Sequence, residues 1–342
     1  MMQTRNVMLA GAVLAWLCSL PAAAGQAQSR LEPSASQEPT TQSTSPNTVQ
    51  QERDGATWFD RMQQALRTQN FSASLVHVQG QRVELFRWLH GRTEDGVELE
   101  LLFSLNGPDI YLVRQNQQVS YFHPMISPYS LRAQALFGPI PTAFYESFDR
   151  ISPSYSAVAM GGGRVLDRPA QHIRLVPKDQ QRFGYSLWLD RETGMLLRMA
   201  TVAPTGDILE QVQLTSLDFS TEIQTDLLQV QDSPMPPLVR DPDAGSALQH
   251  EWRQTWLPEG FSRVRANHHR LPMTGIAADY FLYTDGMTRV SVYVSQDPRA
   301  STNLQYEGLE SLYTHRHRDF SVTVVGRLPM ETLQRIAASV AR

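Results

Sequence analysis

The sequence of 342 residues contains one cysteine, and that residue lies in a segment that is expected to be removed. Cys18 is part of an apolar run over residues 7–20, which Arg5 precedes and Pro21 and three alanines follow. A charged start, a short hydrophobic stretch and an A-x-A site are typical of a secretory signal peptide, here residues 1–24. The exported chain then has no thiol, which excludes disulfides, a cysteine nucleophile and a thiolate metal site.

Long hydrophobic runs and an excess of positive charge are also missing. After residue 24, no segment approaches the roughly 20 apolar residues of a membrane span. The formal net charge of −4 argues against nucleic acid as a partner. Hydrophobic residues make up 41% of the chain, which is enough for a sizeable core, so we expect an exported protein that folds in water.

Motifs for catalysis and phosphate binding are absent as well. The glycine triplet at residues 161–163 lacks the Lys-Ser/Thr pattern of a phosphate loop, and we interpret it as a wide turn between two strands. No G-x-S-x-G elbow occurs, and Asp190 and Glu192 belong to a charged hairpin loop. We therefore predict no catalytic residues and no cofactor.

Two histidine pairs raise the question of a metal site. His268 and His269 are adjacent, and His315 and His317 would share one face of a strand, which is an arrangement that metals can use. Arginines on both sides of His317 oppose a bound cation. We predict no metal site and interpret these histidines as surface residues.

Composition divides the remaining chain into a spacer and two domains. Residues 25–53 are rich in Gln, Ser, Thr and Pro, and we predict that they form a disordered spacer. A first domain is expected over residues 54–220, followed by a proline-rich linker over 221–245. A small α+β domain over 246–342 ends in the helical pattern "METLQRIAASV".

The first domain is predicted to contain one helix and about eleven strands. "TWFDRMQQALRTQN" places its apolar residues on one helical stripe, with Thr57 as the N-cap. Alternating runs such as "FSASLVHV" and "VELELLFSL" follow, with turn signals such as Asn106-Gly107 between them, and a short helix is expected at "SLRAQALFG". An antiparallel sheet of this size must curl or close to protect its edges.

Several stretches, taken in order, carry a family resemblance. They are "WFDRMQQALRTQNFSASLVHVQG", "FSLNGPDIYLVRQ", "DRPAQHIRLVPKDQQRFGYSLWLD", "WLPEGF", "YTDGMTRVSVYV" and "VTVVGRLPMETLQRIA". With these segments the chain resembles the RseB/MucB family of periplasmic regulators of the envelope-stress sigma factor. The resemblance runs from about residue 57 to residue 341, and it departs from the family at Asn106, where Asp is expected, and in the long spacer.

The resemblance implies a mostly β protein with helices. Its large N-terminal domain would be an unclosed antiparallel β-barrel like LolA and LolB, and its smaller C-terminal domain would be α+β. It also implies a periplasmic location and, as partner, the periplasmic region of a membrane anti-sigma factor of the RseA/MucA type. Family members hinder the protease that begins the destruction of that factor, and lipopolysaccharide or other lipid is thought to release them.

We therefore predict a regulatory binding protein without catalysis, which holds an anti-sigma factor and senses lipid through the half-barrel. A periplasmic lipid or lipoprotein carrier is the main alternative, although it leaves the second domain and the linker unexplained. A periplasmic hydrolase is the enzyme alternative. Nucleic acid is not expected as a partner, and self-association is left open.

Strand alternation nominates side chains for the lining of a lipid-binding hollow, because a curled sheet can turn one apolar face towards a ligand. The alternative is that the same side chains form an ordinary core against the helix at residues 57–69. The nominated residues are Leu75, Leu85, Leu99, Leu101, Phe103, Ile110, Leu112, Trp188 and Met199.

Arginines of the second domain are candidates for a patch that binds an acidic partner segment or a phosphorylated headgroup. Residues 246–342 contain 11 Arg and 9 Asp or Glu, so this domain carries +2 while the rest of the chain carries −6. The candidate patch consists of Arg263, Arg265, Arg270, Arg316 and Arg318.

Overall fold

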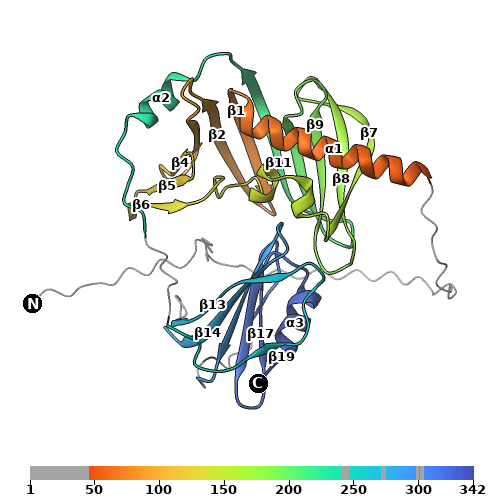
Figure 1. Ribbon diagram of the computed structural model, residues 1–342, viewed down its shortest axis with the longest axis vertical. Coiled ribbons are helices and arrows are strands. Elements are labelled where there is room, and N and C mark those ends of the chain that lie inside the picture. The colour runs from red at the N-terminus through yellow and green to blue at the C-terminus, as the bar shows by residue number, and fades with distance from the viewer. Residues whose placement is uncertain (1–45, 240–245, 271–274, 298–299, 301–303) are drawn as a thin grey trace, which may run out of the picture.

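The computed structural model describes residues 46–239, 246–270, 275–297, 300 and 304–342. The predicted signal peptide and most of the predicted spacer lie outside these residues. Figure 1 shows a large sheet crossed by a long helix and, below it, a smaller sheet domain. In the described part of the chain, no helix is long and apolar enough to cross a membrane.

Helix α1 spans Pro46–Thr68 and begins well before the predicted start. The hydroxyl of Thr57 donates to the carbonyl of Arg53 at 2.9 Å, as it does inside a helix, so the N-cap assignment is wrong. Residues 46–53, which were assigned to the spacer, belong to the helix: Pro46 stands at its first position, where proline is tolerated, and residues 50–53 are Gln, Glu and Arg, which are good helix formers. Phe59, Met62, Ala65 and Leu66 of the apolar stripe of α1 are buried as predicted, and Trp58 is half-buried.

Eleven antiparallel strands form one open sheet, in the order β6-β5-β4-β3-β2-β1-β11-β10-β9-β8-β7. The sheet therefore consists of two meanders that meet where β1 pairs with β11, and β6 and β7 are its edges. This confirms the prediction of a mostly β domain with a large unclosed antiparallel sheet. The strands are β1 (Phe71–Gln79), β2 (Arg82–Arg92), β3 (Glu98–Ser104), β4 (Tyr111–Gln115), β5 (Gln118–His123), β6 (Ile126–Arg132), β7 (Tyr155–Val165), β8 (Arg168–Pro177), β9 (Gly184–Asp190), β10 (Leu196–Val202) and β11 (Ile208–Phe219).

The edge strand β6 occupies the start of the segment that was expected to be a short helix. The chain after α2 (Thr225–Gln231) returns to cover this edge. The backbone N–H of Ser130 donates to the carbonyl of Pro237 at 3.0 Å, and the N–H of Val239 donates to the carbonyl of Ser130 at 2.9 Å. Part of the predicted linker thus belongs structurally to the first domain, where it protects an edge that could otherwise pair with another chain.

The glycine triplet lies inside strand β7, so its interpretation as a wide turn is wrong. The register of β7 against β8 shifts between Ala159 and Gly162, which marks a β-bulge. A Cβ atom on Gly163 would lie 2.5 Å from the ring of Trp188 on β9. Glycine is needed at this position because the indole ring occupies the space of a side chain.

The inner face of the sheet is covered by α1 and by residues 133–154, which we call the covering segment (Figure 1). This segment contains the 3-10 turns η1 (Thr142–Tyr145) and η2 (Phe148–Arg150). Phe144 packs edge to face on Phe59 of α1, with ring centroids 5.7 Å apart. The core of the first domain lies between the sheet and these two elements.

The outer face of the sheet has a second, smaller core under α2. Leu227 of this helix packs with Leu89 of β2 and Leu99 of β3, and all three side chains are fully buried. An apolar pattern on both faces of the central strands therefore has a structural cause, because each face is covered by a different helix.

The second domain contains a six-stranded antiparallel sheet in the order β13-β14-β15-β18-β17-β16, with α3 (Met330–Ala338) packed on one face. This agrees with the predicted small α+β domain. Its strands are β12 (Arg253–Gln254), β13 (Ser262–Arg270), β14 (Ala277–Thr284), β15 (Arg289–Ser295), β16 (Gln305–Tyr306), β17 (Ser311–Arg316), β18 (Ser321–Gly326) and β19 (Val340–Ala341).

Substitution of two glycines in the triplet should have different effects on stability. Gly163→Ala should lower the free energy of unfolding by about 1–3 kcal/mol, because the new methyl group must displace the Trp188 ring. Gly161→Ala is the matched control, since a Cβ atom there meets nothing within 4 Å. Urea unfolding followed by tryptophan fluorescence measures both variants, and equal stabilities would contradict the packing described here.

Candidate functional site

The nine nominated lining residues do not share one face of the sheet. In the strand registers, Leu75 of β1 lies opposite Phe86 of β2, and Trp88 lies opposite Leu102 of β3. These side chains point to the inner face. Three of the nine nominated residues lie on this face: Leu75, Leu112 and Met199.

The strand residues of the other parity point to the outer face, so their nomination for the inner lining is wrong. Leu99 and Leu101 pack in the small core under α2. Leu85 and Phe103 belong to the same side of β2 and β3, and Leu85 is exposed to solvent. Trp188 also lies on the outer face, where its ring stacks on His172 of β8 at 4.4 Å.

Ile110 is not in a strand. It directly precedes β4, and its carbonyl accepts a hydrogen bond from the N–H of Ser104 at 3.0 Å. Contact of any of the nine residues with a ligand stays a prediction.

The hollow on the inner face is filled by the protein itself. The covering segment inserts Leu136, Ile140 and Phe144 among the side chains of the sheet, and all three are buried. A cavity beside Leu75 and Trp88 measures about 10 Å³, which is about the space of one water molecule. An acyl chain can enter only if the covering segment moves.

A fully buried carboxylate anchors the covering segment to the sheet. Glu100 of β3 accepts hydrogen bonds from the indole N–H of Trp88 at 2.8 Å and from the hydroxyl of Tyr145 at 2.9 Å. Its second oxygen accepts from Nε of Arg114 on β4 at 2.7 Å. Tyr145 belongs to η1, so this one side chain links the covering segment to three strands of the sheet.

Arg114 extends the cluster to a second carboxylate. Its guanidinium is fully buried, and it donates to Glu98 at 2.7 Å and to the carbonyl of Asn116 at 3.2 Å. The ring of His90 lies 3.3 Å from the same Glu98 oxygen and 2.6 Å from the carbonyl of Gln69. A buried arginine between two carboxylates is costly to form but is fixed in one geometry once its bonds are made.

The end of α1 joins the same cluster. Nε of Arg67 donates to the carbonyl of Tyr145 at 2.9 Å, and its guanidinium lies 3.6 Å from Glu98. Burial raises the pKa of the Tyr145 hydroxyl well above its ordinary value, so this group stays a proton donor to Glu100. Because both oxygens of Glu100 have protein partners, we assign the cluster a structural role, as the anchor of the covering segment.

Exposed apolar side chains gather at one end of the large sheet. The β1–β2, β3–β4, β5–β6 and β10–β11 connections all lie at this end, because the strands alternate in direction. We call the residues concerned the hairpin rim. Their exposed fractions are 54% for Val83, 51% for Leu105, 83% for Met125, 39% for Ile126 and 58% for Ile208.

The second domain contacts the first domain at the same end. Arg327, which precedes α3, donates a hydrogen bond to Glu210 at the start of β11. Glu210 also binds the ring of His77 at 2.8 Å and accepts from the hydroxyl of Thr201 at 3.0 Å. Burial alone would raise the pKa of Glu210, but the bond to His77 and the charge of Arg327 hold it below its ordinary value. The hairpin rim therefore borders the space between the two domains (Figure 1).

The five nominated arginines do not form one patch. Arg263, Arg265 and Arg270 lie on the edge strand β13, whereas Arg316 ends β17 and Arg318 follows it. Four strand spacings separate β13 from β17, or about 19 Å across the sheet. The prediction of a single surface is wrong. It was based on positions in the sequence, which do not show that β13 and β17 lie far apart in the sheet. A role for either group in partner binding stays a prediction.

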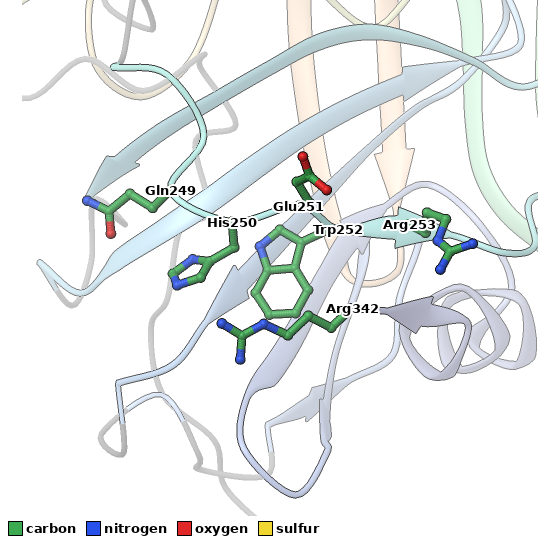
Figure 2. A pocket seen from close by; sticks show the side chains of 6 residues that line it. All are labelled: Gln249, His250, Glu251, Trp252, Arg253 and Arg342. Carbon is green, nitrogen blue, oxygen red and sulfur yellow. The ribbon is translucent and has the colours of Figure 1, made fainter.

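A shallow pocket of about 670 Å³ lies at the far pole of the second domain. Figure 2 shows the His250 ring and the Arg342 guanidinium beside the ring of Trp252, while Arg253 points away. The buried carboxylate of Asp279 fixes the Trp252 ring, because it accepts a hydrogen bond from the indole N–H at 2.7 Å. The pocket is remote from the hollow and the hairpin rim, so it is not part of the candidate site.

The histidine pairs have structural partners. His268 binds Asp279 at 2.8 Å, and the rings of His315 and His317 meet edge to face at 4.6 Å. His317 also stacks on Phe320 at 4.3 Å. Among the residues that the structure describes, no three His, Cys, Asp or Glu side chains are grouped to hold a metal ion.

The pH dependence of stability should report on the buried cluster. Burial alone would raise the pKa of Glu98, but hydrogen bonds from His90 and Arg114 and their charges lower it from 4.5 to about 2. A depressed pKa in the folded state contributes stability that is complete above about pH 4.5 and is lost as the pH falls through about 2. Between pH 5.5 and 2.5, Glu98→Gln should therefore lose about 2 kcal/mol less stability than the wild type.

Glu94→Gln is the control for this measurement, because it removes an exposed carboxylate from the loop before β3. Chemical unfolding at a series of pH values compares the three proteins. If Glu98→Gln followed the wild-type curve throughout, the proposed stabilisation of ionised Glu98 would be incorrect.

Comparison with known proteins covers both domains. A family model described as the MucB/RseB N-terminal domain matches residues 54–238, and one described as the MucB/RseB C-terminal domain matches residues 246–341. The sigma-E factor regulatory protein RseB of Salmonella typhimurium is 30% identical over 284 residues, which are 82% of this chain and 89% of that protein.

Solved structures give the same result. The complex structure of Pseudomonas aeruginosa MucA/MucB is similar with a TM-score of 0.68 and 25% identity, over 84% of this chain and 98% of that chain. A crystal structure of MucB in complex with MucA(peri) has a TM-score of 0.65 and 27% identity, with the same coverage. From the two family models, which together match most of its length, and from these similarities, we conclude that this chain belongs to the MucB/RseB family.

Proposed function

We propose that this chain is a periplasmic regulator that binds the periplasmic region of a membrane anti-sigma factor and shields it from regulated proteolysis. The observation that carries the proposal is family membership across both domains, together with the similarity to MucB in two complexes with MucA. The signal peptide expected at residues 1–24 supports export. The relative from Salmonella typhimurium is named as a regulatory protein, which supports a role without catalysis.

The hairpin rim is the surface that we propose for the anti-sigma segment. It exposes large apolar side chains at four adjacent connections and borders the space between the domains. An extended segment that lies there buries apolar area on a preformed surface, which is the main source of affinity at the centre of protein interfaces. The neighbouring Arg82 is exposed and supplies positive charge for an acidic segment.

We propose further that the half-barrel senses lipid, including lipopolysaccharide, and that lipid weakens the hold on the anti-sigma segment. An apolar inner face supports burial of an acyl chain, at about 0.8 kcal/mol per CH₂ group. The hollow is filled by side chains, so a sensor that opens only when its ligand binds agrees better with the structure than a carrier does. A carrier would need a permanent cavity for its cargo.

The rim proposal predicts a specific loss of binding. Val83→Asp combined with Leu105→Asp should weaken binding of a synthetic anti-sigma periplasmic segment at least tenfold, because two apolar anchors become charged. Calorimetry measures the affinity. The control is Met160→Asp, which alters a side chain of similar exposure, 49%, elsewhere on the first domain. Equal affinities for the wild type, the double variant and the control would contradict the proposed surface.

A protease assay tests the wider proposal. The site-specific protease that cuts the anti-sigma segment should act more slowly when the full chain is present, and added lipopolysaccharide should restore the rate. An unchanged cleavage rate at saturating concentrations of the chain would reject the shielding function.

A further inference from the structure

The β14–β15 hairpin of the second domain reaches into the first domain (Figure 1). Its tip, residues 285–288, places Met287 against the main core of the first domain. Gly286 has a φ of +91°, and a Cβ atom there would lie 2.8 Å from the carbonyl oxygen of Arg150. The contact is so close that only glycine fits without movement.

A buried ion pair fixes the tip in place. Arg182, between β8 and β9, is 1% exposed and donates to Asp285 at 2.6 Å. The same guanidinium binds Asp179 at 2.9 Å and the carbonyl of Glu259 at 2.7 Å. The other oxygen of Asp285 accepts from the backbone N–H of Thr288 at 2.7 Å, so one carboxylate both shapes the turn and docks it.

The hairpin also contacts the covering segment, at residues other than the Tyr145 that binds Glu100. Gly286 lies against Arg150 and 3.4 Å from Ile151, measured from the position of a Cβ atom. The guanidinium of Arg289 lies 5.6 Å from the ring centroid of Phe137, which is a cation–π contact. The segment that fills the hollow is thus held between Glu100 within the first domain and the hairpin of the second.

We propose that the β14–β15 hairpin is an intramolecular clamp on the covering segment, so that the docked hairpin and an acyl chain in the hollow exclude each other. This inference rests on the lipid-sensing part of the proposed function. An acyl chain needs the space of Leu136 and Ile140, and the covering segment can leave that space only when the contacts of Phe137 and Ile151 with the hairpin are broken.

The clamp couples the hollow to the arrangement of the domains. A ligand that binds only the undocked state shifts the population towards it, and the docked state weakens lipid binding by the same factor. Undocking of the hairpin also moves the second domain relative to the hairpin rim. Lipid bound in the hollow would in this way change the surface that binds the anti-sigma segment, although it does not touch that surface.

The test compares two glycines on the full chain. Gly286→Ala forces a methyl group towards Arg150, whereas Gly206→Ala introduces the same backbone strain in the β10–β11 turn, where a Cβ atom meets nothing within 4 Å. The probe is cis-parinaric acid, a fluorescent fatty acid with 18 carbons. We expect Gly286→Ala to bind it at least tenfold more tightly than the wild type, and Gly206→Ala to bind it as the wild type does.

A second pair of variants guards against a folding defect in the turn. Arg289→Ala removes the contact with Phe137 without adding a group to the turn, and it should also tighten probe binding, by about two- to fivefold for one exposed cation–π contact. Arg335→Ala, which removes the cation–π contact of an exposed arginine of α3 with Trp256, should not. Equal probe affinities for all five proteins, or no probe binding by any of them, would overturn the clamp. Calorimetry with the anti-sigma segment runs in parallel, and binding there would leave the regulatory function intact.

Discussion

The apolar inner face of an open eleven-stranded sheet must be kept from water, and this requirement organises the rest of the molecule. An open sheet of this width has no partner sheet to cover it, so α1 and the covering segment form the second layer. The burial of Glu100 and Arg114 costs free energy, but it ties the covering segment to three strands in one geometry. What the hollow can accept therefore depends on whether this layer stays in place.

The same layer connects the two domains. It is bound to Glu100 through Tyr145 and is also contacted by the β14–β15 hairpin, where Arg182 and Asp285 form a buried pair across the domain boundary. A second bond, from Arg327 to Glu210, lies at the same end of the sheet. The covering segment therefore contacts both the inner face of the large sheet and the second domain.

Much of the fold could be predicted from the sequence, because strands, hairpins and both terminal helical patterns have strong local signals. The side-chain parity of β2 and β3 could not. Glu98 and Glu100 alternate with leucines, and charged positions normally face water, so the pattern assigned Leu99 and Leu101 to the inside. The charges instead face inward because Arg114 on β4 lies opposite Glu100. The sequence did contain a signal for this inward orientation, namely the opposite charges of Glu100 and Arg114 in neighbouring strands. The strand order that separates Arg263 from Arg316 had no local signal at all.

Hydrogen exchange during lipid titration tests the central claim most directly. Amide protection of residues 133–151 and of residues 284–288 is followed by mass spectrometry as a fatty acid is added to the full chain. If the covering segment and the hairpin form one clamp, both stretches lose protection together, with the same midpoint, while β9 and β10 stay protected. Saturation with lipid while residues 284–288 keep their protection would contradict the account.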